Sequence, residues 1–104
     1  MRQDLIDEFV ARLEAERYYD AHESLEELWF PRRFEDNDEV RLLKGFINAA
    51  VSFELVKRGR PGPSERAWNN YLKYLPLLET IESEFSDAYR ETAKKVEMIK
   101  AALG

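Results

Sequence analysis

Apolar residues recur at spacings of three and four along most of the chain, a pattern typical of amphipathic helices. The first predicted helix spans residues 4–16, with Leu5, Ile6, Phe9, Val10 and Leu13 on one face. A second helix is predicted from near Asp20, as N-cap, to Trp29, with Glu23 completing a capping box. It ends there because Pro31 cannot continue it.

The stretch over residues 40–58 is unusually apolar nearly all round and is too long for one strand. We interpret it as a central, buried helix, capped at its start by Asn37 or Asp38. Gly59 follows as a typical residue just beyond a helix C-terminus.

Two further helices are predicted in the last third of the chain. The fourth helix begins at the turn containing Pro63 and breaks before Pro76, because an interior proline removes a hydrogen bond. The last helix is capped by Ser83 or Ser86 and ends at Gly104. One of its faces carries Phe85, Tyr89, Ala93, Val96, Ile99 and Leu103.

No segment alternates as a strand would, so the predicted fold is all-α. We expect a compact irregular or orthogonal helical bundle around the central helix at about residues 40–58. The helix breaks come too often for a regular coiled coil. At 104 residues, the chain is the length of one domain, which we place over residues 1–104.

Composition narrows the class of protein. Hydrophobic residues at 44% supply enough apolar surface to order the chain, which excludes an intrinsically disordered protein. With 21 acidic against 16 basic residues, the net charge is -5, so we expect neither nucleic acid nor a membrane as partner. There is no cysteine, and the charged N-terminal residues lack the apolar run of a signal peptide. We expect a soluble, cytoplasmic protein.

One group of residues carries possible chemistry. The single histidine of the chain, His22, falls within the apolar stripe of the second helix, with Glu26 one turn further on and Trp29 adjacent. Glu23 lies further toward solvent. A buried imidazole needs a hydrogen-bond partner, and a lone histidine on an apolar face is more often structural than functional.

The central helix carries a polar seam of Arg41, Lys44, Asn48 and Ser52 at helical spacing. If this helix packs antiparallel to the second, the seam faces His22 and Glu26. The candidate site therefore contains His22, Glu23, Glu26, Lys44 and Asn48. A sealed network would specify packing, whereas one opening on a cleft could bind a ligand or move a proton.

Metal chemistry is not favoured at this site. The segment HESLE matches the HExxH metalloprotease signature only in its first two residues, since Glu26 replaces the second histidine. Di-iron bundles use two Glu-x-x-His motifs, which one histidine cannot supply. His22 and Glu26 would be the ligands of any metal, and no cofactor is expected.

Two segments of the chain carry recognisable motifs. The first, YYDAHESLEELW, has tyrosine, histidine, glutamate and tryptophan at characteristic positions, and the second, KGFINAAVSFELVKRGRPGPSERA, has glycine at characteristic positions. Together they resemble the helical family called domain of unknown function 309, over about residues 18–75. The matching positions are Tyr18, Ala21, His22, Glu23, Glu26, Trp29, Gly45, Phe46, Ile47, Ala49, Gly59 and Ala67. The final helices fit the family loosely.

The resemblance implies a compact all-α domain with His22 and Glu26 as the family's site residues, and it implies no activity. Two departures change the polar surroundings of His22. Lys44 and Asn48 stand where the family shows glutamine, and Phe30 stands where an arginine commonly follows the tryptophan.

Two functions remain open on the sequence. The first is a non-catalytic binding or assembly module that presents a helical surface to itself or to a partner. The alternative is an enzyme or a metal- or ligand-binding protein that uses a cleft at His22 and Glu26. Because so short a chain must place two tryptophans, five tyrosines and six phenylalanines, we also predict a homodimer.

Overall fold

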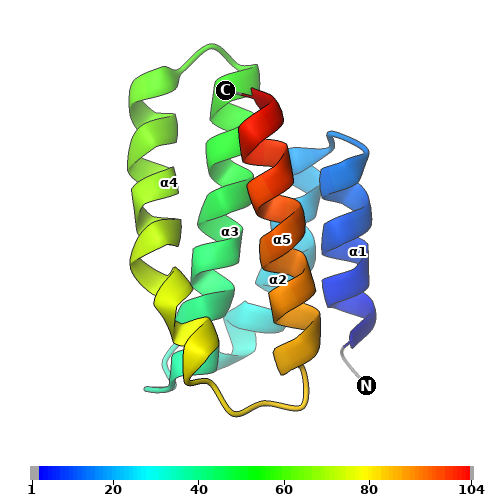
Figure 1. Cartoon of the computed structure of the whole chain (residues 1–104), viewed down its shortest axis with the longest axis vertical. Coiled ribbons are helices and arrows are strands. Elements are labelled where there is room, and N and C mark those ends of the chain that lie inside the picture. Colours follow the sequence, from blue (N-terminus) through cyan, green and yellow to red (C-terminus); the bar gives the residue numbers. More distant parts are fainter. Residues whose placement is uncertain (1–2, 104) are drawn as a thin grey trace.

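The computed structural model describes residues 3–103, which form five α-helices, two short 3-10 segments and no strand. The elements are α1 (Gln3–Glu14), α2 (Tyr18–Trp29), η1 (Phe30–Arg32), α3 (Asp38–Lys57), α4 (Pro61–Tyr74), η2 (Leu75–Glu79) and α5 (Ser86–Leu103). Consecutive helices alternate in direction along the long axis, and α5 lies across the front of the others (Figure 1). The predicted all-α bundle is confirmed.

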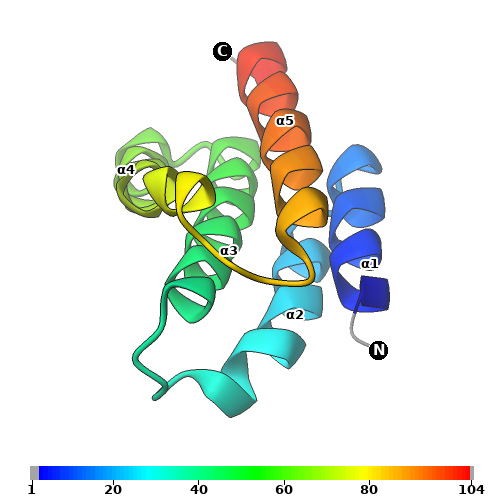
Figure 2. The same ribbon diagram turned by 60° about the horizontal axis from the view of Figure 1, so that its bottom comes forward.

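Helix α3 is the centre of the bundle, as predicted. It packs between α2 on one side and α4 on the other (Figure 2). Its Phe46 ring is fully buried and lies within 6.3 Å, between ring centroids, of Phe9 on α1, Tyr71 on α4 and Tyr89 on α5. Although α3 is apolar, no helix within residues 3–103 is long and hydrophobic enough to cross a bilayer.

Most helix ends fall where local signals predict them. The side chain of Asn37 accepts a hydrogen bond from the Val40 amide at 2.9 Å and so caps α3. Gly59 adopts a φ of 72° just after α3, a conformation that glycine enters without strain. Helix α4 ends at Tyr74, before Pro76, and continues as the 3-10 segment η2.

Helix α5 begins with a reciprocal serine cap. Ser83 Oγ accepts from the Phe85 amide at 3.1 Å, and Ser86 Oγ accepts from the Ser83 amide at 3.2 Å. The two bonds satisfy amides that have no partner within the helix. The predicted end of this helix at Gly104 lies outside the described residues.

The turn between α1 and α2 differs from the prediction. Helix α1 ends at Glu14, and α2 begins at Tyr18 without a side-chain cap, so the capping box at Asp20 is wrong. The Asp20 carboxylate instead accepts a hydrogen bond from Arg17 Nε at 2.8 Å. Glu16 adopts a φ of 61°, in the left-handed region, while the Arg17 amide bonds back to the Arg12 carbonyl at 2.8 Å.

Helices α3 and α4 approach each other closely at Gly45. A Cβ atom at this position would lie 3.1 Å from the Cβ of Tyr74. Further along the same interface, Ser52 and Ser64 are both buried, and each hydroxyl donates to the carbonyl of the other residue at 2.8 Å. Small residues therefore set the spacing between these two helices.

Candidate functional site

His22 lies at the edge of the core on α2, with its side chain 15% exposed. Its Nε2 atom is 3.2 Å from Glu26 Oε1, one helical turn away, and its Nδ1 atom faces the backbone oxygen of Tyr19. A neutral imidazole has one N–H and can donate to one of these oxygens, whereas an imidazolium donates to both. The structure thus brings two predicted site residues, His22 and Glu26, into direct contact.

Lys44 and Asn48 have other contacts. The Lys44 ammonium lies 5.8 Å from the centroid of the Trp29 ring, and the Asn48 amide donates to the Lys44 carbonyl at 2.9 Å. Among residues 3–103, no hydrogen bond or ion pair joins either residue to His22. Glu23 is exposed on α2.

The two ends of the polar seam on α3 also turn to separate partners. Arg41 forms ion pairs with Asp36 and Asp38, both close in sequence to it. Ser52 bonds to Ser64 on α4, on the opposite side of α3 from α2. The seam therefore does not act as one surface toward His22.

His22 lines a hollow of about 180 Å³ between α2 and α3. Its walls include Tyr19 from α2 and Val51 and Leu55 from α3. The charged groups at its edge are already paired, since Arg58 Nε lies 2.6 Å from Glu54 Oε2. His22 is therefore neither sealed in the core nor at the floor of a large polar pocket.

The described residues contain no group of three or more histidine, cysteine, aspartate or glutamate side chains placed to hold a metal ion. His22 and Glu26 offer two ligands, whereas zinc sites in proteins use three or four. A metal at this position would need further ligands from solvent or from another chain.

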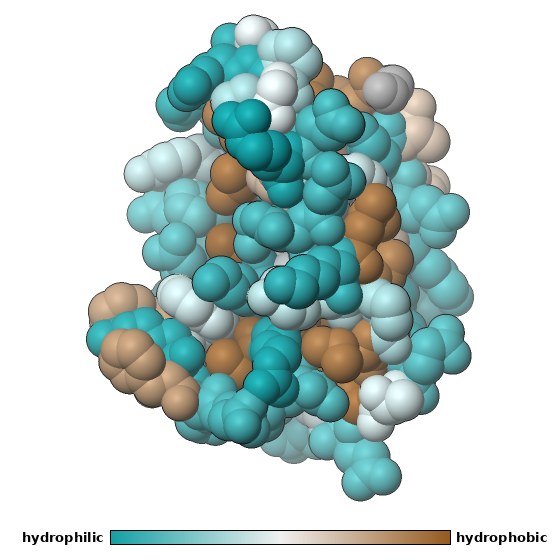
Figure 3. Space-filling view, turned by 90° about the vertical axis from the view of Figure 1, so that its left-hand side faces the viewer, coloured by the Kyte–Doolittle hydropathy of each residue, from teal (hydrophilic) through white to brown (hydrophobic). Residues whose placement is uncertain are grey.

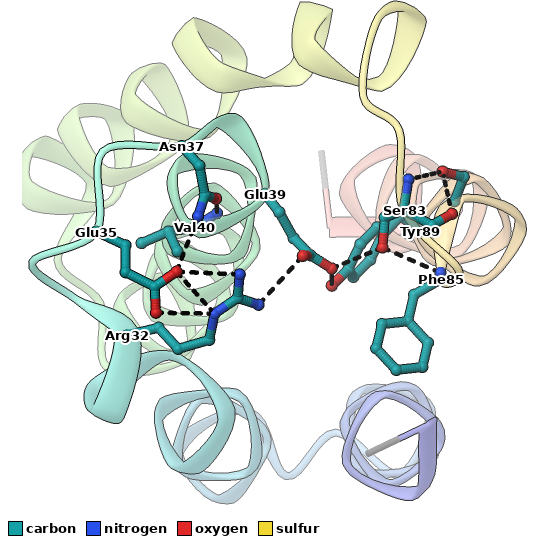
Figure 4. Close-up of polar contacts among 9 residues, drawn as sticks. Arg32, Glu35, Asn37, Glu39, Val40, Ser83, Phe85 and Tyr89 are labelled. Carbon is teal, nitrogen blue, oxygen red and sulfur yellow. Dashed lines mark hydrogen bonds and ion pairs between the residues drawn. The ribbon is translucent and has the colours of Figure 1, made fainter. Parts of the chain in front are cut away.

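A second polar cluster, which the sequence analysis missed, centres on Glu39 in the first turn of α3 (Figure 4). Glu39 Oε1 accepts from Arg32 Nη1 at 3.1 Å. Its other oxygen accepts from Ser83 Oγ at 2.7 Å and from the Tyr89 hydroxyl at 2.8 Å. Burial opposes ionisation of Glu39, but these three hydrogen bonds outweigh it and hold the pKa of the carboxyl below its ordinary value.

The Glu39 cluster is structural in character. Each carboxylate oxygen is occupied by protein donors, and burial raises the pKa of Tyr89 far above its ordinary value. An acidic residue in a first turn is commonplace, so the pattern alone gives no signal for this role. Its partners Ser83 and Tyr89 lie 44 and 50 residues further along the chain.

A larger feature, also missed, is a groove between α4 and α5, which we call the α4–α5 groove. It consists of two hollows of about 470 and 480 Å³ that share Trp68 and Lys100. Apolar side chains provide most of the lining, among them Phe53, Val56, Leu72, Leu75 and Leu103. Viewed from the side of α4, hydrophobic areas border a hydrophilic ridge (Figure 3).

The fold and these sites define a small all-α bundle domain with a histidine–glutamate pair at the edge of the core and an apolar groove between α4 and α5. The chain belongs to the family described as "Domain of unknown function (DUF309)", which matches residues 6–70. The match includes His22, Glu26 and most of α4, and it stops before α5. No curated protein and no solved structure matches the chain.

Proposed function

We propose that this chain is a non-catalytic helical binding or assembly module that docks another protein chain in the α4–α5 groove. The observation that carries the proposal is the groove itself, whose two hollows are both lined by Trp68 and Lys100. Burying apolar surface is the main driving force of protein association, and the lining of this groove is mostly apolar.

The side chains at the groove support a docking role. Leu72 is 43% exposed although it is a large aliphatic residue, and Val56 and Leu103 at the other end are also exposed. Each would gain free energy on being covered, at about 25 cal/mol per Å² of apolar surface buried. The hollow beside His22 is smaller and offers less surface of this kind.

The groove can be tested with an apolar fluorescent dye, anilinonaphthalene sulfonate, added to the folded protein. We expect the dye to bind and to shift the amide NMR signals of α4 and α5, and Leu72→Glu to abolish this binding. Met98→Glu is the matched control, because Met98 is 65% exposed on α5 but does not line the groove. The test is made at a protein concentration where the chain is monomeric, so that no second copy competes with the dye. Absence of dye binding to the monomeric wild type, or binding confined to other helices, contradicts the proposal.

The second candidate function is an enzyme or a metal- or ligand-binding protein that uses His22 and Glu26. It is favoured by one observation, namely that His22 opens on a hollow instead of being sealed. Elemental analysis of protein purified without chelator tests for a metal. A near-stoichiometric metal that is lost in His22→Ala would support this candidate over the binding module.

A further inference from the structure

We propose that the occupant of the α4–α5 groove is a second copy of this chain, so that the protein assembles as a symmetric homodimer through α4 and α5. The inference rests on the proposed function, a binding module, and names its partner. It concerns a surface to which α5 contributes, and α5 lies outside the residues matched by the family.

The charges around the groove favour a second copy. The whole chain carries a net charge of -5, so two copies repel each other overall unless the contact surface is locally balanced. The groove is locally balanced, because its lining contains the carboxylates of Glu65 and Glu97 and the ammonium groups of Lys94 and Lys100. A strongly acidic or strongly basic partner would meet two like charges there, whereas a second copy brings an equal number of both signs.

The placement of these charges also suits a two-fold interface. In such an interface, the same surface lies on both sides, so each contact occurs twice. Among residues 3–103, Glu65 and Glu97 form no ion pair, and the Lys100 ammonium lies 5.2 Å from the centroid of the Trp68 ring. Within the same residues, Lys94 is paired only with the exposed Glu91 on its own helix. The two glutamates therefore remain open to the lysines of a partner copy.

The length of the groove suits a helix as the inserted element. One edge runs the length of α4, from Pro61 to Leu75 at the start of η2, and the 14 residues of α4 span about 20 Å at the rise of an α-helix. The copy itself offers α4 and α5, each with exposed apolar residues beside the groove. If a helix of each copy packed into the α4–α5 groove of the other, Leu72 would be covered in both copies.

The first test is the mass of the full chain in solution, measured by sedimentation equilibrium from low micromolar to near-millimolar concentration. We expect twice the monomer mass of 12.3 kDa at the upper concentrations. Leu72→Glu should weaken the dimer about thirtyfold or more, as expected for a residue central to an interface, whereas Met98→Glu should not. Circular dichroism confirms that both variants are folded.

A second test uses charge and does not depend on how the helices pair. The variant K94E/K100E has an acidic groove and E65K/E97K has a basic one, so each should be monomeric on its own. An equimolar mixture of the two should form a heterodimer, because the grooves are then opposite in charge. Dimers of either variant alone, or a monomeric mixture, overturn the inference.

The outcomes separate this inference from the proposed function. A wild type that stays monomeric throughout overturns the homodimer. If the dye still binds in the groove and Leu72→Glu abolishes that binding, the groove remains a docking surface for a different chain. If the dye does not bind either, the binding module fails as well.

Discussion

The hydroxyl of Tyr89 donates a hydrogen bond to Glu39 Oε2 at 2.8 Å and thereby joins α5 to the first turn of α3. Arg32 bonds to the other oxygen of the same carboxylate, so one side chain on α3 is bonded both to η1, seven residues earlier, and to α5, 50 residues later (Figure 4). Hydrogen bonds to a charged group are stronger than neutral ones, and this cluster is half-buried.

We predict that Glu39→Gln lowers the free energy of unfolding by about 1–3 kcal/mol at neutral pH. For a domain of this size, the melting temperature should fall by several degrees. Glutamine keeps one acceptor oxygen but loses the charge that pairs with Arg32. Glu91→Gln is the control, since Glu91 is exposed and pairs with Lys94 on its own helix, and it should melt with the wild type.

The lowered pKa of the Glu39 carboxyl predicts that the stability of the protein falls at acid pH. The pKa of Glu39 is lower in the folded protein than its ordinary value of 4.5, so the unfolded chain takes up a proton first as the pH falls. The stabilisation is fully present above about 4.5 and is lost as the pH drops through the folded pKa. Melting curves of the wild type and Glu39→Gln should differ most at neutral pH and converge in acid. A gap that is independent of pH would contradict this assignment.

Glu16 occupies a left-handed conformation in the turn after α1, which costs a residue with a Cβ atom about 1 kcal/mol relative to glycine. We predict that Glu16→Gly stabilises the protein by roughly this amount, measured as a higher denaturant midpoint. The backbone oxygen that accepts from Lys57 is unaffected by the substitution. Glu14→Gly, in the last turn of α1, should have the opposite effect because glycine weakens a helix.

Gly45→Ala sets two effects against each other. Alanine favours the helical conformation by about 1 kcal/mol, but its Cβ would come within 3.1 Å of the Tyr74 Cβ. That atom is attached directly to the backbone of α4, so α4 itself must move. We predict a net loss of stability and a lower melting temperature, since overpacking typically costs about 1–3 kcal/mol. A variant more stable than the wild type would show that α4 yields easily.

His22→Ala should lower the stability by about 1–3 kcal/mol, because it leaves a cavity and removes the partner of Glu26. Glu23→Ala on the exposed side of the same helix is the control. Destabilisation without any bound metal indicates a structural histidine. A variant that melts with the wild type in the absence of metal would show that His22 does not support the core.

The helices were predictable because their signals act over a few residues. The spacing of apolar residues shows where each helix runs. Its ends are marked by local signals, such as the Asn37 cap before α3, Gly59 after it and Pro76 after α4. The cap at Asp20 failed for an equally local reason, since Arg17 three residues earlier pairs with that carboxylate. The types of residue in a segment do not show whether a carboxylate will bind a backbone amide, as a cap does, or a nearby arginine.

The candidate site was only partly predictable. The contact between His22 and Glu26 follows from one helical turn, whereas the predicted approach of Lys44 and Asn48 required two helices to pack in a particular rotation. In the structure Lys44 lies over the Trp29 ring instead, and Asn48 donates to the backbone carbonyl of Lys44. The α4–α5 groove depends on helices that meet only in the folded chain, so no spacing in the sequence reveals it.

The cap and the Glu39 cluster hold α5 at its beginning, and its last fully buried residue is Val96. Beyond that point, the helix presents only exposed or half-buried side chains as far as Leu103. Its final turns should therefore open by fraying, at a lower free energy than global unfolding. Amide hydrogens after Val96 should then exchange with deuterium faster than those near Tyr89. Because Lys100 and Leu103 in these turns line the α4–α5 groove, the groove has one wall that can change its position when another chain binds.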